Sequence, residues 1–454
     1  MQGTEPPATS ALELAGADLG ASPRYRIEGG SPLVGEIEVR AAKNAINKQL
    51  VASLLTDEPC TFTHLPRIRE IDAILDMLAE VGTSYAWLSD DTLCVQTRSI
   101  QSSVVSQRYS GFNRIPILLL SPLLHRAGQA TVPRMGGDRI GPRPVDFHIE
   151  GLQKMGMAIE VCPDSFRATG SKLRGVSLTL PYPSVGATEN LIISATLARG
   201  TTVIENAAVE PEILDTILFL QKMGALINVE TDRRIIVEGV SRLRGASHRP
   251  ISDRIEVSSF GAAAIASGGR IRVRGAQQQH MISFLNSIRK VGGGFEVDDA
   301  GITFFRERDV LRPLHVETNV HPGFMTDWQQ PFVVMLTQAR GISTLHETVS
   351  EDRFGYVDTL LKMGADIALT DTCLGNTPCR YLRRDHLHSC TIRGPTPLRA
   401  TEMTIPDLRA GFAYIIAALL AEGTSTIDGT SYLERGYADV PGKLRAIGAQ
   451  IELC

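Results

Sequence analysis

Apolar residues recur along this chain at helical spacing, and the segments that carry the pattern follow one another at regular intervals. In residues 44–55, apolar side chains such as Leu50 and Leu54 fall on one helical face. Residues 187–199 and 408–421 are almost wholly apolar, and a helix that is apolar on every side is buried on every side. The segments predicted as helices of this first kind are 44–55, 114–127, 187–199, 254–267, 328–340 and 408–421.

A second helix follows each of these segments, after a short β-branched strand and a loop. Each second helix ends in an apolar residue and a glycine, which is the usual left-handed cap at a helix end. These glycines are Gly82, Gly156, Gly224, Gly292, Gly364 and Gly448. A repeat of roughly seventy residues predicts an array of similar units. We therefore predict an α/β fold of six βαβαββ-like units, with the first helices inside and the sheets outside.

Composition agrees with an ordinary globular protein. The chain has 454 residues, 43% of them hydrophobic and 21% charged, which is enough for two or three domains. A net charge of −4 gives no reason to expect a nucleic acid partner. The apolar runs are shorter than the roughly 18–20 residues of a membrane span, so no membrane is expected. Residues 1–24 are rich in Ala, Gly, Pro and Ser, and we expect a disordered leader that is not a signal peptide.

The cysteines bear on location and on metal binding. Seven scattered cysteines favour reduced thiols in a cytoplasmic protein. One tract gathers several possible zinc ligands, but its C-x5-C-x6-H-x-H-x-C spacing matches no common ligand set. We therefore expect loop and strand residues there, with no metal and no cofactor, and keep a zinc site as the alternative. The tract consists of Cys373, Cys379, His386, His388 and Cys390.

Basic residues stand at the predicted starts of helices. Helix N-termini carry unpaired N–H groups and favour anions, and arginine binds a carboxylate or a phosphate with two parallel hydrogen bonds. Several such residues at equivalent positions indicate a ligand with more than one anionic group. The alternative is that each is a surface charge or the partner of a nearby aspartate. The residues are Lys43, Arg114, Arg143, Arg353, Arg409 and Arg435.

Three aspartates also precede predicted helices. Asp253, Asp327 and Asp407 can each act as an N-cap, accepting backbone N–H groups. We expect this structural role for Asp253. Asp327 and Asp407 are candidates for the site as well, because their loops also carry the anion-binding residues.

The motifs that contain these residues match one family closely. They are residues 42–45 (AKNA), 136–146, 184–188, 205–212, 253–256, 407–410 and 435–437. From about Tyr25 to the C-terminus the chain resembles the UDP-N-acetylglucosamine 1-carboxyvinyltransferases, enolpyruvyl transferases that begin peptidoglycan precursor synthesis. The resemblance implies two inside-out α/β barrels of three units each. It also implies that residues 43–251 form the nucleotide-binding barrel with the catalytic loop, and that residues 25–42 and 252–454 form the second barrel.

The resemblance implies substrate positions as well. Phosphoenolpyruvate would lie between the barrels, with its phosphate near Lys43, Arg143 and Arg435 and its carboxylate near Arg353 and Arg409. The residues implied around the uracil of UDP-N-acetylglucosamine are Arg143, Pro144, Val145, Asp146 and Phe147. Those implied at its diphosphate are Ser184, Val185 and Gly186, and those implied at its amino sugar are Asn44, Asp327 and the backbone of Val349.

Enolpyruvyl transfer needs an acid at C3 of the enol, a base on the sugar hydroxyl and fixed positive charge around the leaving phosphate. The resemblance implies Asp138 as the acid, and we choose Asp327 as the base. Arg114 and the loop around Asp138 are expected to close over the ligands. The full set implied as catalytic is Lys43, Asp138, Asp327, Asp407 and Arg435.

The chain departs from the family at several positions. Most members carry cysteine where this chain has Asp138, and the inhibitor fosfomycin alkylates that thiol. A carboxylate is a far poorer nucleophile, so resistance to fosfomycin is expected. Tyr182 stands where many members have a lysine near the nucleotide phosphates, and Ser350 replaces a common aromatic residue.

Other functions remain open from the sequence. The sister enzyme of the shikimate pathway shares the fold, although the 184–188 loop and the 143–146 run match the nucleotide-using branch. A closer alternative, supported by Tyr182, is a relative that transfers the enolpyruvyl group to a free uridine nucleotide. A catalytically silent protein that binds a sugar nucleotide is a third possibility. Chain crossings near residues 42–43 and 251–252 predict closure when ligand binds, and the oligomeric state stays open.

Overall fold

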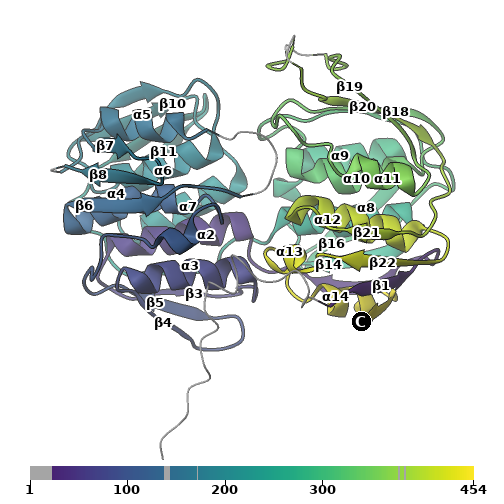
Figure 1. Cartoon of the computed structure of the whole chain (residues 1–454), viewed down its shortest axis with the longest axis horizontal. Coiled ribbons are helices and arrows are strands. Elements are labelled where there is room, and N and C mark those ends of the chain that lie inside the picture. Colours follow the sequence, from purple (N-terminus) through teal and green to yellow (C-terminus); the bar gives the residue numbers. More distant parts are fainter. Residues whose placement is uncertain (1–22, 138–143, 171, 377–378, 383–384) are drawn as a thin grey trace, which may run out of the picture.

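The computed structural model describes residues 23–137, 144–170, 172–376, 379–382 and 385–454. The molecule has two halves side by side, each with helices at its centre and sheets around them (Figure 1). The chain between Ala41 and Leu243 contributes one apolar core, called here the first half. The chain from Tyr25 to Val39 and from Val257 to Ile451 contributes the other, called here the second half.

The predicted first helices form the interior of both halves. Every residue of α8 is buried, as expected for a helix that is apolar all round. The helix predicted from residue 114 begins instead at Pro116, because the Asn113 side chain accepts a hydrogen bond from the Ile115 N–H (3.0 Å) and proline then occupies the first helical position. Among the described residues the inner helices are α2 (Lys43–Ala52), α4 (Pro116–Ala127), α6 (Val185–Ala195), α8 (Arg254–Ala266), α10 (Gln329–Leu336) and α12 (Leu408–Leu420).

The second helices end as the repeat predicts. The glycine after each one has a left-handed backbone, with φ between 82° and 110°. These helices are α3 (Arg69–Glu80), α5 (Asp146–Lys154), α7 (Pro211–Lys222), α9 (Ile282–Val291), α11 (Val357–Lys362) and α14 (Val440–Ala446). Shorter helical turns are η1 (Ser53–Leu55), η2 (Gln107–Tyr109), η3 (Gln278–His280), η4 (Thr326–Trp328) and α13 (Ser431–Glu434). The predicted fold class is therefore confirmed.

Six sheets form the outer layer of the described molecule, one for each unit. In the first half their strand orders are β13 (Ser247–His248)-β3 (Cys60–Phe62)-β5 (Leu93–Gln96)-β4 (Ser84–Trp87), β6 (Gln129–Pro133)-β8 (Ser165–Thr169)-β7 (Ala158–Val161) and β11 (Leu226–Glu230)-β12 (Arg234–Glu238)-β10 (Thr201–Glu205)-β9 (Ser177–Thr179). In the second half they are β15 (Gly293–Asp298)-β16 (Gly301–Arg306)-β14 (Arg270–Arg274)-β2 (Val34–Glu38), β17 (His315–Glu317)-β18 (Gly341–His346)-β20 (Ser389–Gly394)-β19 (Asp366–Thr370) and β21 (Glu402–Thr404)-β22 (Thr424–Asp428)-β1 (Tyr25–Glu28)-β23 (Gln450–Leu453).

Most of these sheets combine one parallel pair with an antiparallel hairpin. In one sheet β9 runs parallel to β10, with Ser177 opposite Val203, while β12 runs antiparallel to β10, with Glu238 opposite Thr201. The hairpin strands expose alternate residues, as expected for sheets covered on one face only.

Two chain segments cross side by side between the halves. The Ala42 N–H donates to the Ile251 carbonyl (2.7 Å), and the Asp253 N–H donates to the Arg40 carbonyl (2.9 Å). We propose the division into two domains at these crossings, with residues 43–251 as one and residues 25–42 with 252–454 as the other. No helix in the described part of the chain is long and apolar enough to span a membrane.

Candidate active site

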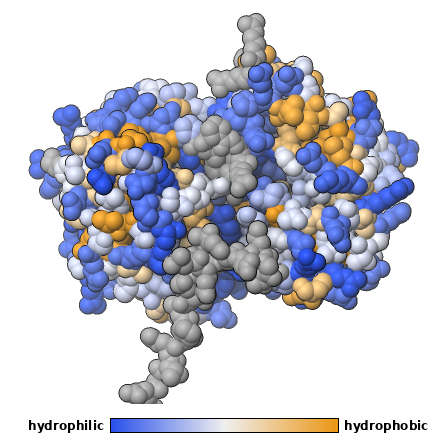
Figure 2. Space-filling model, in the orientation of Figure 1, coloured by the Kyte–Doolittle hydropathy of each residue, from blue (hydrophilic) through white to orange (hydrophobic). Residues whose placement is uncertain are grey.

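A cleft of about 480 Å³ lies between the two halves and takes side chains from both. This volume lies in the range of small-molecule sites. Hydrophilic residues cover much of the outer surface of both halves, with apolar patches between them, on the face shown in Figure 2. The predicted site residues that line the cleft are Lys43, Asn44, Arg114, Pro144, Asp146, Phe147, Ser184, Val185, Gly186, Asp327, Val349, Arg353, Arg409 and Arg435.

Four predicted residues stand apart from that set. Val145 and Asp407 are not among the described residues that line the cleft. Val145 is partly buried against the core of the first half. Asp138 and Arg143 lie outside the described residues, so their assignments continue to rest on the sequence.

One buried carboxylate holds two cations from opposite halves. Glu70 of α3 is 2% exposed. It accepts hydrogen bonds from Arg435 Nε (3.2 Å) and Nη2 (3.0 Å), and Lys43 Nζ lies 3.7 Å from it. Asn113 donates to its other oxygen (3.0 Å). Glu70 therefore fixes the positions of Lys43 and Arg435. Glu70 was not predicted from the sequence because its partners are distant in the chain.

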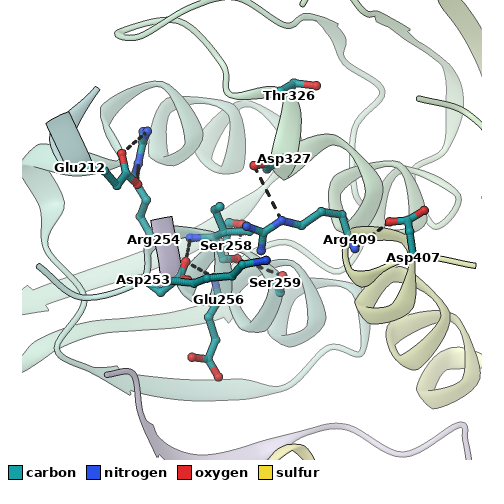
Figure 3. Close-up of polar contacts among 12 residues, drawn as sticks. Glu212, Asp253, Arg254, Glu256, Ser258, Ser259, Thr326, Asp327, Asp407 and Arg409 are labelled. Carbon is teal, nitrogen blue, oxygen red and sulfur yellow. Dashed lines mark hydrogen bonds and ion pairs between the residues drawn. The ribbon is translucent and has the colours of Figure 1, made fainter. Parts of the chain in front are cut away.

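A second carboxylate lies between two buried arginines. Asp327 of η4 forms an ion pair with Arg353, and its other oxygen is 3.8 Å from Arg409 Nε. Arg353 is 4% exposed and Arg409 5%. Figure 3 shows the Arg409 side chain extending from α12 toward Asp327. The arrangement places one proton acceptor beside two donors that suit a carboxylate ligand.

The two remaining aspartates are helix caps. Asp253 accepts the N–H groups of Ile255 (2.8 Å) and Glu256 (3.3 Å), which confirms its expected structural role. Asp407 accepts the N–H groups of Arg409 (2.8 Å) and Ala410 (3.0 Å) (Figure 3). Its side chain thus fixes the first turn of α12, from which Arg409 extends into the cleft. We accordingly propose a positioning role for Asp407 in place of the catalytic role implied by the resemblance.

The N-terminus of α6 opens into the cleft on the side of the first half. The Ser184 hydroxyl accepts the Ala187 N–H (3.4 Å) and caps the helix. The N–H groups of Val185 and Gly186 belong to the first turn, where a helix has no internal acceptors for them. This geometry suits a phosphate.

His148 adds a neutral donor beside this helix end. Burial, aided by Arg114, lowers the pKa of His148 to about 3. Asn190 Nδ2 donates to His148 Nδ1 (3.1 Å), so the proton of the neutral ring is on Nε2. A Cβ at Gly186 would lie 3.2 Å from His148 Nε2, so glycine allows the close approach. His148 was not predicted from the sequence, although it directly follows the predicted uracil residues.

Arg380 brings a further cation to the cleft. Its guanidinium lies over the Tyr182 ring, 4.6 Å from the ring centroid. It also donates to the Val349 carbonyl (2.6 Å) and to the Glu351 carboxylate (3.0 Å). Tyr182 comes from the first half and Arg380 from the second. The substitution of tyrosine for lysine at 182 was the one sequence signal that pointed to this place.

Two buried ion pairs also line the cleft. Arg254 binds Glu212 with two hydrogen bonds (2.9 and 3.0 Å) and joins α8 to α7 across the halves (Figure 3). Burial opposes ionisation of Glu212, but Arg254 outweighs it and lowers the pKa of that carboxyl. Lys48 Nζ lies 3.4 Å from Glu189. There burial prevails, and the pKa of Glu189 rises to about 7.

The raised pKa of Glu189 gives a testable pH dependence. A carboxyl with a pKa of 4.5 when exposed and about 7 when folded contributes stability below pH 4.5, and this is lost as the pH rises toward 7. Glu189→Gln cannot ionise, so its thermal midpoint is expected to fall less than that of the wild type over this range. The control is Glu230→Gln, at an exposed ion pair with Arg234. Parallel curves for wild type and Glu189→Gln would contradict the assignment.

The fold is that of the enolpyruvyl transferases. The enolpyruvyl transferase NikO from Streptomyces tendae matches with a TM-score of 0.84 and 21% identity, covering 95% of this chain and 99% of its own. EPSP synthase from Acinetobacter baumannii matches with a TM-score of 0.72 and 17% identity, covering 95% and 100%. A family model for EPSP synthase (3-phosphoshikimate 1-carboxyvinyltransferase) matches residues 27–444.

Relatives with higher sequence identity show to which family of enolpyruvyl transferases the chain belongs. The chain is 50% identical over 435 residues to UDP-N-acetylglucosamine 1-carboxyvinyltransferase of Protochlamydia amoebophila, covering 94% of each chain. It is 48% identical to the protein of that name from Chlamydia pneumoniae, with the same coverage. It is 38% identical to that from Zymomonas mobilis, covering 94% of this chain and 99% of the relative. The chain belongs to the UDP-N-acetylglucosamine 1-carboxyvinyltransferase family, which confirms the resemblance.

Proposed function

We propose that the protein transfers the enolpyruvyl group of phosphoenolpyruvate to the 3-hydroxyl of UDP-N-acetylglucosamine and releases phosphate. The observation that carries this proposal is the set of cations in one cleft, drawn from both halves: Lys43, Arg114, Arg353, Arg380, Arg409 and Arg435. A ligand pair with a phosphate, a carboxylate and a diphosphate fits so many donors. The proposal includes a cytoplasmic location and a role in cell-wall synthesis, and through it in cell shape and division.

Phosphoenolpyruvate is placed by two groups of cations. Its phosphate lies between Lys43 and Arg435, which Glu70 holds on either side of the boundary between the halves. Its carboxylate binds Arg353 and Arg409, which already share one carboxylate partner in Asp327. Fixed positive charge at the phosphate stabilises it as it leaves.

The chemistry proceeds by addition and elimination. Asp327 takes the proton of the sugar hydroxyl while the hydroxyl oxygen bonds to C2 of phosphoenolpyruvate, and an acid protonates C3 of the enol. The tetrahedral ketal then loses a proton from C3 and its C2–O bond to phosphate, and the double bond returns. Asp138 is our choice for the acid, from the sequence. An Asp138→Asn variant with full turnover would remove it from that role.

The nucleotide binds on the side of the first half. The diphosphate takes the N–H groups at the start of α6 and the neutral Nε2–H of His148. Arg380 supplies the positive charge that is absent at Tyr182, since its guanidinium lies on that ring. The uracil lies against the segment from Arg143 to Phe147, and Asn44 with the backbone of Val349 holds the amino sugar.

The decisive assay measures phosphate released from phosphoenolpyruvate with different acceptors. Release with UDP-N-acetylglucosamine, together with a product heavier by one enolpyruvyl group, supports the proposal. Release only with a bare uridine nucleotide supports the nucleotide-modifying alternative. Release only with 3-phosphoshikimate supports the sister activity, and none with any acceptor supports a catalytically silent binding protein.

Resistance to fosfomycin is a separate prediction. Residue 138 is aspartate, and a carboxylate opens the epoxide far more slowly than a thiolate does. The purified enzyme is expected to keep its activity during incubation with fosfomycin. Asp138→Cys is expected to gain time-dependent, irreversible inactivation, whereas Asp138→Ser is not. Rapid inactivation of the wild type would contradict the prediction.

A further inference from the structure

Four side chains that are not among the described residues lining the cleft converge in the second half. His346 ends β18, Cys373 and Cys379 lie in the loop between β19 and β20, and His388 directly precedes β20. One ligand atom from each lies within 4.8 Å of all the others. We propose that these four residues bind one Zn²⁺ ion in a tetrahedral Cys₂His₂ site.

The ligand atoms are spaced close to the separations of a tetrahedral zinc site. Zinc bonds of about 2.3 Å to sulfur and 2.0–2.1 Å to nitrogen place tetrahedral ligands roughly 3.3–3.8 Å apart. Cys373 Sγ lies 3.2 Å from His388 Nε2. Two thiolates and two neutral imidazoles balance the charge of the ion, so the site carries no net charge.

The hydrogen bonds fix the tautomer of His346. Ser389 Oγ donates to the Thr372 carbonyl (2.7 Å), so it accepts from His346 Nδ1 (2.8 Å). The lone pair of His346 is therefore on Nε2. This residue is 0% exposed, and among the described residues its Nε2 has no hydrogen-bond partner. An unpaired nitrogen buried in protein is costly unless something binds it, and a metal ion satisfies it.

His388 is oriented in the same way. Its Nδ1 donates to the His386 carbonyl (2.6 Å), which leaves the lone pair on Nε2 facing Cys373. A backbone or side-chain acceptor on the second nitrogen is the usual support of a zinc-bound histidine. His388 is also 0% exposed. Both imidazoles thus present Nε2 to one point.

The sulfur atoms and the loop complete the site. Cys379 Sγ accepts the Tyr381 N–H (3.3 Å), a contact that stabilises a thiolate. Zinc is bound by thiolates, so its binding displaces the protons of the two thiols. A Cβ at Gly375 would lie 2.3 Å from His346 Cδ2. The loop can cover His346 only because residue 375 is glycine.

The sequence alone argued against a metal because the tract from 373 to 390 has the wrong spacing. Two of its members are not ligands: Cys390 is buried in the core of the second half, and His386 contributes its carbonyl. The missing ligand is His346, which arrives from another strand of the same sheet. No metal was expected from the sequence, and the tertiary cluster is the reason to propose one.

Zinc binding would also hold one residue of the cleft, Arg380, in position. Arg380 directly follows Cys379, and its guanidinium binds Val349 and covers Tyr182. This consequence depends on the proposed function, but the metal site itself does not. Metal content therefore tests the site, and the KM for UDP-N-acetylglucosamine tests the link to the cleft.

The experiment measures zinc in the full-length protein, purified under reducing conditions without chelator. We expect about one equivalent per chain, and after chelation and addition of Co²⁺ the intense visible absorption of tetrahedral cobalt with thiolate charge transfer. Cys379→Ser and His388→Gln are expected to lose both signals. Cys94→Ser and Cys454→Ser, which change cysteines outside the cluster, are the matched controls and keep both.

Several results would overturn the site. The first is a wild-type protein that contains no zinc and also fails to bind cobalt. The second is a disulfide between Cys373 and Cys379 in the reduced preparation. The third is an unchanged zinc content in both Cys379→Ser and His388→Gln. Circular dichroism establishes that each variant is folded. The cobalt titration of stripped wild type keeps the test decisive if a variant does not fold. A rise in KM for the nucleotide on zinc removal, with little change in kcat, supports the link through Arg380, and an unchanged KM removes that link alone.

Discussion

Asp327→Asn is expected to lower kcat for enolpyruvyl transfer by about 10²- to 10⁴-fold, the usual contribution of a general base. The amide keeps the shape of the side chain but does not accept a proton. Steady-state phosphate release at saturating substrates measures the effect. Because Asp327 also pairs with Arg353 and Arg409, a moderate change in KM for phosphoenolpyruvate is expected as well.

Two further aspartate variants serve as controls that distinguish a catalytic role of Asp327 from a structural one. Asp407→Asn changes a helix cap that supports Arg409, and we expect a smaller loss because the amide oxygen still accepts N–H groups. Asp366→Asn, in an exposed ion pair with Arg393, is expected to have no effect. If Asp327→Asn keeps wild-type turnover, Asp327 is not the base.

The second large effect concerns stability. Glu212→Leu is expected to destabilise the protein by about 3–5 kcal/mol, because it leaves the Arg254 guanidinium buried without its partner. Arg254 is 2% exposed, and the ion pair joins the two halves. Urea unfolding at neutral pH measures the change, as an earlier transition midpoint.

The double variant provides the control. Glu212→Leu with Arg254→Met removes both charges together, and replacing a whole buried pair with apolar groups is often neutral. We expect it to recover most of the lost stability. Glu434→Gln breaks the ion pair with Arg69, which also spans the halves but is 35–39% exposed, so a loss below about 1 kcal/mol is expected. Equal losses in Glu212→Leu and Glu434→Gln would contradict the argument from burial.

The elements of the fold were predictable because their signals are local. Helical spacing of apolar residues and a glycine at each helix end are properties of short segments, and the left-handed backbone at Gly292 or Gly448 follows from the residue itself. In the described part of the chain, the predicted helices differ from the observed ones at their ends. The helix near residue 114 begins two positions later because Asn113 and Pro116 together set its start.

The candidate site was only partly predictable. Lys43, Arg353 and Arg409 were marked by their places near helix starts, and the structure brings them to one cleft. Glu70 and Arg380 were not predicted, because Glu70 lies near the start of α3 but is acidic, and Arg380 lies outside the described helices. Each acts with a partner from the other half of the molecule: Glu70 binds Arg435, and Arg380 lies over the ring of Tyr182.

The sequence by itself determined the repeated unit, its helices and caps, and the presence of cations at several helix starts, because each depends on residues within one or two turns. The tertiary structure alone decided which charges meet. It placed Glu70 between two cations, left Asp407 outside the described lining of the cleft, and brought His346 to the cysteines of a distant loop. Such contacts depend on the packing of whole units, and no spacing along the chain specifies them.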